Sequence, residues 1–276
     1  MLLLHGLGSS SYSFRQTLTL LEAEGVDAIA PDWIGHGFSS MPDPFDCTEA
    51  SYHKALSAFI GSLGLDKEPY ALVVHGFILS QYALTYALEH QGQVERLMIL
   101  NTPVAKNSKL RPELAAYKNP LPFLRPAAGK AFDAMNFNAA GSPYAMSYND
   151  AAVFAAPYEL SPIASQIIGK TMEKVDFSSL LKKVDEGYIS WRKPAALCFG
   201  SSDSFLETGC VFQFLDSKRT NMKAMTMTGK VGHSPQEDYP ELLHQNLMLF
   251  LDGTPEEWTA QINKKYKISK VGVEEI

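Results

Sequence analysis

The chain has 276 residues, about the length of one α/β domain. Apolar residues make up 46% of it and charged residues 20%, a balance that excludes a mainly disordered chain. Its 24 basic and 30 acidic side chains give a net charge of −6, which argues against a nucleic-acid-binding protein, and its apolar runs are far shorter than the roughly 20 residues of a membrane span.

The hydrophobic pattern alternates short strand-like runs with longer helical runs. It therefore predicts an α/β fold, with a mostly parallel sheet and helices on both faces. The predicted strands are Leu2–Leu4, Asp27–Ala30, Ala71–Val74, Val94–Leu100, Ala195–Phe199 and Lys223–Met227. The predicted helices, with apolar residues at helical spacing, are Thr17–Glu24, Tyr52–Leu63, Leu79–His90 and Glu241–Leu251.

The alternation stops between Pro103 and Lys193, where prolines recur and no strand–helix rhythm is visible. We interpret residues 103–193 as a helical cap inserted into a core made of residues 1–102 and 194–251. Residues 252–276 form a C-terminal extension. Within it Trp258, Ile262 and Tyr266 lie four residues apart, which predicts a helix over Glu256–Tyr266 that packs through Trp258.

A glycine-containing turn, His5-Gly6-Leu7-Gly8, follows the first predicted strand. Such a turn lets backbone N–H groups point at a developing oxyanion, although most turns of this kind are only structural. After the next strand, Asp32 begins a loop with two glycines, and we expect its carboxylate to accept hydrogen bonds within that loop. His36, in the same loop, is given no catalytic role.

The strand Ala71–Val74 leads through His75, Gly76 and Phe77 into an amphipathic helix. This strand–turn–helix unit is where a nucleophile elbow would lie. The residue at its tip is Gly76, which has no side chain and cannot attack a substrate. Ser80 lies about one helical turn further along, so its hydroxyl should not reach the same point.

An acid and a histidine follow two successive predicted strands, Asp203 after Ala195–Phe199 and His233 after Lys223–Met227. The carboxyl ends of parallel strands meet at one edge of a sheet, so Asp203 could orient the His233 imidazole and stabilise its protonated form. The widely spaced cysteines fit neither a disulfide framework nor a zinc site. No cofactor and no metal site is expected.

In order and spacing, these segments resemble the α/β-hydrolase superfamily, and most closely its capped epoxide-hydrolase and haloalkane-dehalogenase branch. The matching stretches are LLLHGLGSSSYSFR, APDWIGHGFSS, LVVHGFILSQYAL, RLMILNTP, CFGSSDSFL and GKVGHSPQEDYPELL, which run from Leu2 to about Leu251. The resemblance implies an oxyanion hole at Leu7 and Phe77, with Asp203 and His233 as triad acid and base. Active relatives carry Ser, Asp or Cys where this chain has Gly76.

The resemblance carries two further expectations. The chain begins at what resembles the family's third strand, so the usual first hairpin is expected to be missing. Either the sequence is truncated or something else covers the edge at Leu2–Leu4, because an uncovered edge there would be prone to aggregation. The elbow sequence HGFILSQYAL also resembles plant and algal hydrolase-like proteins, which implies a chloroplast location, with the cytoplasm as the alternative.

Three functions remain open at this point. The chain is a non-catalytic hydrolase-fold protein that binds a small apolar ligand or a protein partner, or it is a structural subunit of a larger assembly. Alternatively it is a hydrolase or cofactor-free lyase in which the Asp203–His233 pair acts as general base. Gly76 favours the first two, and the retained pair favours the third.

Overall fold

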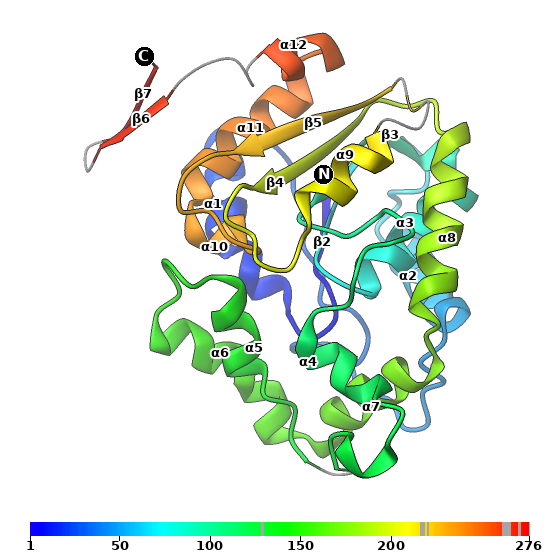
Figure 1. Cartoon of the computed structure of the whole chain (residues 1–276). Helices are drawn as coiled ribbons and strands as arrows, with labels where there is room; N and C mark the ends of the chain where they lie inside the picture. Colours follow the sequence, from blue (N-terminus) through cyan, green and yellow to red (C-terminus); the bar gives the residue numbers. More distant parts are fainter. Residues whose placement is uncertain (128–129, 216–218, 220, 261–265, 270–271, 276) are drawn as a thin grey trace.

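The computed structural model describes residues 1–127, 130–215, 219, 221–260, 266–269 and 272–275. Within them, five parallel strands form one sheet in the order β1-β2-β3-β4-β5 (Figure 1). Their bounds are β1 Leu2–Leu4, β2 Tyr70–His75, β3 Val94–Leu100, β4 Ala195–Gly200 and β5 Met222–Met227. The predicted parallel sheet is thereby confirmed, because five of the six apolar runs proposed as strands pair in it.

Alternate residues of each strand face opposite layers of helices. Leu3 and Val73 belong to an apolar core shared with helices α1 (Arg15–Ala23) and α11 (Pro240–Asp252). Their neighbours in the strands belong to the core on the other face. That core is built with α2 (Glu49–Ser62), α3 (Leu79–Glu89), α8 (Phe177–Gly187) and α9 (Thr208–Leu215). Figure 1 shows α1 and α11 on one side of the sheet and α2, α3 and α8 on the other.

The expected strand Asp27–Ala30 was wrong, although part of this segment lies along the outer edge of β1. Only Ile29 forms a bridge, and it does so on the outer edge of β1. The Leu3 N–H donates to the Ile29 carbonyl at 2.8 Å, and the Ile29 N–H donates to the Met1 carbonyl at 2.9 Å. Pro31 follows with no N–H to donate, so the pairing cannot extend into a strand on this side.

Between β3 and β4 the described residues form helices and turns but no strand. The helices there are α4 Pro112–Ala115, α5 Ala134–Gly141, α6 Tyr148–Leu160, α7 Pro162–Lys174 and α8. Figure 1 shows α4, α5, α6 and α7 below the carboxyl end of the sheet. In contrast, α8 packs along α3. Tyr188, which directly follows α8, adds to this contact by donating its hydroxyl to the Leu84 carbonyl at 3.0 Å. The segment predicted as a cap therefore supplies one helix to the core layer.

The tail prediction was right about Trp258 and wrong about the length of the helix. Helix α12 covers Pro255–Ala260, and Trp258 in it is buried against the Phe250 ring, 5.4 Å away between centroids. Tyr266 begins a strand instead: β6 (Tyr266–Ser269) pairs antiparallel with β7 (Gly272–Glu275). Ile262 lies outside the described residues. No helix in the described parts of the chain is long and apolar enough to cross a membrane.

Candidate functional site

The turn between β2 and α3 has a backbone that suits glycine at its tip. Gly76 has φ +91°, in the region that side-chain-bearing residues rarely adopt. A Cβ built at this position would lie 3.3 Å from the Gly6 Cα, so a small side chain would fit only tightly. Position 76 thus has the geometry of an elbow tip and carries no reactive atom.

The start of α3 is tightened by a γ-turn centred on Ile78, which has φ 64° and ψ −69°. The Leu79 N–H donates to the Phe77 carbonyl at 2.8 Å, and the Ile78 N–H donates to the Gln81 side chain. Ser80 turns back on the elbow and donates its hydroxyl to the Gly76 carbonyl at 2.5 Å. As expected from its place in the helix, Ser80 is not among the residues that line the cavity above Gly76.

Of the two predicted oxyanion donors, the Leu7 N–H is already hydrogen-bonded to another described residue and the Phe77 N–H is not. The Leu7 N–H donates to the Phe77 carbonyl at 2.9 Å and is therefore committed to the protein backbone. No described residue accepts a hydrogen bond from the Phe77 N–H, which lies beside Gly6. This conformation offers one of the two donors that the resemblance implied, because the γ-turn directs the Phe77 carbonyl at the other.

The loop before Gly8 is held by a buried, neutral histidine. His5 Nδ1–H donates to the Gly6 carbonyl at 2.9 Å, and its Nε2 accepts from the Trp33 N–H at 3.2 Å. Burial lowers the pKa of His5, which agrees with this neutral tautomer. Asp32 accepts from the Phe38 N–H at 2.8 Å, which confirms its predicted hydrogen bonding within its own loop, and from the Ser11 N–H at 2.6 Å, which links that loop to the segment after β1.

Asp203 and His233 meet beyond the carboxyl ends of β4 and β5, where their Oδ2 and Nδ1 atoms lie 2.9 Å apart. Asp203 also accepts from the N–H groups of Phe205 at 2.8 Å and Leu206 at 3.2 Å. Burial opposes its charge, but His233 and the other donors outweigh burial and hold the pKa of Asp203 below its ordinary value. Asp203 therefore orients the His233 imidazole through Nδ1, and Nε2 remains to accept or donate a proton.

Sequence reasoning missed Asn101, which supports the acid. Asn101 follows β3 with φ 42°, and its Nδ2 donates to Asp203 Oδ2 at 2.8 Å and to the Gly232 carbonyl at 3.1 Å. The available signal was a polar residue at the carboxyl end of a predicted strand, next to the strand that carries Asp203. Asn101 ties the two loops that carry Asp203 and His233 to each other.

A second missed residue, His75, supports the loop that carries His233. Its Nε2–H donates to the His233 carbonyl at 2.8 Å, and its Nδ1 accepts from Gln236 at 3.2 Å. Burial, with the nearby His233, lowers the pKa of His75 to about 3, so the ring stays neutral. His75 is therefore a structural partner of the site and not a second base.

A small cavity, with a volume of about 10 Å³, joins these groups. That space suits about one water molecule, whereas sites for drug-sized ligands are typically about 300–1,000 Å³. The cavity is lined by Gly6, Leu7, Ser9, His75, Gly76, Phe77, Arg111, Phe137, Asn138, His233 and Ser234. The predicted site residues Leu7, Gly76, Phe77 and His233 thus line one small cavity, and Asp203 is hydrogen-bonded to the histidine.

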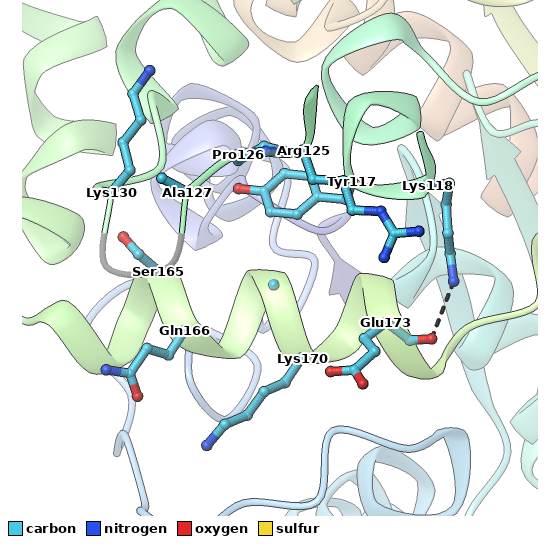
Figure 2. Close-up of a pocket in the computed structure, with 11 residues that line it drawn as sticks. Tyr117, Lys118, Arg125, Pro126, Ala127, Lys130, Ser165, Gln166, Lys170 and Glu173 are labelled. Carbon is cyan, nitrogen blue, oxygen red and sulfur yellow. Dashed lines mark hydrogen bonds between the residues drawn. The ribbon is translucent and has the colours of Figure 1, made fainter. Parts of the chain in front are cut away.

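A larger cavity, of about 640 Å³, lies on the helical segment and shares no lining residue with the small one. It lies between residues 117–127, with Lys130, and helix α7, and Figure 2 shows Lys118 hydrogen-bonded to the Glu173 carbonyl. Its lining includes Lys118, Arg125, Lys130 and Lys170, against the single acid Glu173. None of the acid–base residues above takes part in it.

Four polar side chains tie helix α6 to the core beside the loop that carries His233. Arg15 lies 2.9 Å from Asp150 of α6 and 2.6 Å from Glu237 of α10 (Pro235–Asp238). Tyr12 donates its hydroxyl to Asp150 at 2.9 Å. Burial raises the pKa of Glu237 to about 7 although Arg15 opposes the rise, and Asp150 and Asp238 add to it.

This raised pKa predicts a pH-dependent stability. Because folded Glu237 holds its proton up to about pH 7 and an unfolded glutamate only to about 4.5, the stabilisation is complete below pH 4.5 and lost as the pH rises to 7. We expect the free energy of unfolding to fall by up to about 3 kcal/mol over that range, and Glu237→Gln to remove most of the fall. Urea titrations at several pH values measure it, with exposed Glu159→Gln as the control. An unchanged slope in Glu237→Gln would refute this origin.

In the described residues, no group of three or more His, Cys, Asp or Glu side chains is placed to hold a metal ion. The reactive groups that the structure brings together are therefore Asp203 and His233. Their arrangement can accept a proton at His233 Nε2 and can offer the Phe77 N–H to a negative charge.

Comparison with known proteins agrees with this architecture. Among the solved structures that are similar to the chain over most of their length, three examples are each less than 25% identical to it. The haloalkane dehalogenase DbeA from Bradyrhizobium elkani USDA94 has a TM-score of 0.71 and 21% identity, covering 95% of this chain and 89% of that one. The 2-hydroxy-6-oxo-6-phenylhexa-2,4-dienoate hydrolase from Rhodococcus sp. strain RHA1 has a TM-score of 0.70 and 16% identity, covering 91% and 89%.

The thioesterase domain from the curacin biosynthetic pathway has a TM-score of 0.67 and 18% identity, covering 91% of this chain and 90% of that one. At these identities the three likenesses establish the fold. The model of the alpha/beta hydrolase family matches residues 1–245, most of the chain. Together with the parallel sheet and its helical layers, this match shows that the chain belongs to the alpha/beta hydrolase family.

Proposed function

We propose that this chain is an α/β-hydrolase-fold protein with a degenerate nucleophile elbow, a non-catalytic ligand-binding or assembly subunit that forms no covalent intermediate at position 76. One observation carries the proposal. His233 is held by Asp203 as a triad base would be, yet position 76, which shares its cavity, has no side chain. No described hydroxyl, thiol or carboxylate lies within hydrogen-bond distance of His233 Nε2.

Two physical arguments support the loss of nucleophilic catalysis. Removing the nucleophile of a serine triad costs about a millionfold in turnover, since the remaining groups act only as a unit. In addition, the Leu7 N–H is already bonded to Phe77, and each missing oxyanion donor costs roughly a hundred- to a thousandfold. The serines that do line the cavity, Ser9 and Ser234, make no hydrogen bond to His233.

The alternative is a hydrolase or cofactor-free lyase that uses the Asp203–His233 pair directly. The observation that favours it is the water-sized space beside His233. His233 Nε2 would take a proton from water, whose oxygen then attacks the substrate, or from a substrate C–H group. The Phe77 N–H would stabilise the negative charge that develops on the substrate. We also propose a plastid location for the chain, on the basis of its resemblance to plant and algal hydrolase-like proteins.

Covalent labelling tests the proposal. After incubation of the purified chain with p-nitrophenyl acetate or a fluorophosphonate, we expect peptide mass spectrometry to find no adduct on any serine. An acyl or phosphonyl adduct mapped to Ser9, Ser80 or Ser234 by peptide mass spectrometry would overturn it. The direct-base alternative is tested separately. It requires turnover of ester, epoxide or haloalkane substrates that His233→Ala abolishes while the protein stays unlabelled.

A further inference from the structure

We propose that the turn formed by residues 120–125 docks the chain on the surface of an anionic lipid bilayer. This interaction is separate from any binding above Gly76. Three apolar side chains of the turn are exposed: Leu121 by 49%, Phe123 by 79% and Leu124 by 54%. Figure 1 shows the segment between α4 and α5 beside α7, at the end of the molecule opposite α12. The turn therefore presents a small apolar surface to solvent at one end of the fold.

Prolines keep this turn short, so its apolar side chains have no helix face through which to pack on the core. The prolines of the stretch have no N–H group to donate within a helix, and the turn contains one short 3-10 helix, Pro122–Leu124. The Asn119 side chain accepts from the Leu121 N–H at 3.0 Å, and the Asn119 carbonyl accepts from Arg125 Nε–H at 2.7 Å. These bonds hold the turn in one conformation, so docking costs little further conformational entropy.

The charges around the turn favour a negatively charged surface. Between Glu113 and Asp133 the sequence contains no acidic residue, in a chain whose net charge is −6. Arg125 and Lys130 are exposed, and no acidic side chain in the described parts of the chain forms an ion pair with either of them. Both cations are therefore available to anionic groups outside the protein.

The other cations nearby have partners within the protein. Lys170, on α7, lies 3.7 Å from Asp43, and Figure 2 shows it directed away from the turn. Lys118 donates to the Glu173 carbonyl at 3.1 Å and interacts with the carboxylates of Glu173 and Asp176. The uncompensated positive charge beside the turn is therefore that of the two cations named above.

A bilayer suits this surface better than a protein partner does. Three side chains on one turn expose far less than the roughly 800 Å² that each partner buries in a standard protein interface. They line no part of the cavity in Figure 2, so they offer a partner no pocket there. A bilayer interface takes up leucine and phenylalanine side chains that project from a protein surface, and its anionic headgroups attract arginine and lysine beside them.

Vesicle flotation of the full chain tests the proposal. Vesicles of phosphatidylcholine that contain about 30% phosphatidylglycerol are compared with vesicles of phosphatidylcholine alone. Each basic residue near an anionic surface contributes about fivefold, so we expect about 10–25-fold tighter binding to the anionic vesicles. Salt at about 1 M, where the screening length is about 3 Å, should remove this difference. Equal binding to both kinds of vesicle at low salt, or no binding to the anionic kind, would overturn the proposal.

Two pairs of matched substitutions locate the contact. Phe123→Ser should weaken binding to anionic vesicles by about tenfold, because the bilayer no longer covers the ring. Leu63→Ser, directly after α2 and at a side chain that is 48% exposed, should leave binding unchanged. Arg125→Gln should weaken binding by about fivefold. Its control is Arg192→Gln, at an arginine that also donates to a backbone carbonyl, and it should have no effect. Binding that Phe123→Ser leaves unchanged would place the contact elsewhere and refute the proposal.

Fluorescence shows whether the turn enters the bilayer. In Phe123→Trp, we expect the emission of the new indole to move to shorter wavelength on anionic vesicles and to be quenched by lipids with a spin label near the headgroup. The native tryptophans Trp33, Trp191 and Trp258 are buried and give a constant background. An emission that vesicles do not change would overturn the proposal. So would a chain that ignores vesicles and forms dimers that Phe123→Ser dissociates in analytical ultracentrifugation, because the turn would then be a contact between copies.

Discussion

Gly76→Ser should turn the chain into a protein that p-nitrophenyl acetate acetylates at residue 76. The new hydroxyl would lie at the cavity that Gly76 and His233 both line. The serine oxygen would attack the acetyl carbon, its proton would pass to His233, and p-nitrophenolate would leave. A general base of this kind accelerates the step by about a hundred- to ten-thousandfold, so we expect a burst of p-nitrophenolate that the unmodified chain lacks.

The same geometry limits this gain. The Leu7 N–H stays bonded to the Phe77 carbonyl, so the variant should remain about a hundred- to a thousandfold slower than a site with two oxyanion donors. A side chain at φ +91° also costs about 1–2 kcal/mol of stability.

Stopped-flow absorbance and peptide mass spectrometry measure the burst and locate the adduct. Gly76→Ala carries the same strain without a nucleophile and should show no burst, and Gly76→Ser with His233→Ala should lose it. Acetylation that survives without His233 would contradict the triad geometry.

Trp258→Ala should destabilise the chain by about 3–5 kcal/mol, the usual cost of deleting a buried tryptophan. Trp258 is 1% exposed and packs on Phe250, and its indole N–H donates to the Leu249 carbonyl at 3.0 Å. The substitution therefore removes apolar contacts on α11 and leaves that carbonyl without its indole donor.

Equilibrium urea unfolding measures this loss, with Glu256→Ala on the exposed side of the same helix as the control, expected to change stability by less than about 0.5 kcal/mol. If Trp258→Ala lowers the free energy of unfolding no more than the control does, the packing of α12 on α11 does not stabilise the fold. Hydrogen exchange should agree, with protected amides in α11 of the unmodified chain and faster exchange there in the variant.

The residue pattern by itself determined the layered α/β architecture. The apolar runs that became β1 to β5 are short and are followed by turns, and the helices that cover them show the 3.6-residue period. The glycine at the elbow tip and the order of Asp203 and His233 could also be read from the chain. Such features depend on residues near one another in sequence, or on the rule that the carboxyl ends of parallel strands share an edge.

Tertiary packing decided everything that depends on a particular atom's partner. Asp27–Ala30 has the composition of a strand, but only Ile29 bridges to β1. The helical period from Trp258 to Tyr266 is broken because Tyr266 starts a strand that pairs with β7. The first outcome depends on backbone hydrogen bonds with a distant segment, β1, whereas the second depends on the pairing of two neighbouring strands, β6 and β7. The spacing of apolar residues reveals neither pairing.

The same holds for the chemistry of the site. The sequence places Leu7 where an oxyanion donor is expected, but the γ-turn at Ile78 directs the Phe77 carbonyl to its N–H. Arg111 lies in a stretch with no motif, and only the fold brings its guanidinium over the rings of Phe137 and Phe205 and into the lining of the cavity beside Gly76. Sequence spacing fixes which residues can approach a strand end, whereas free donors and acceptors are known only once every neighbouring group has found its partner.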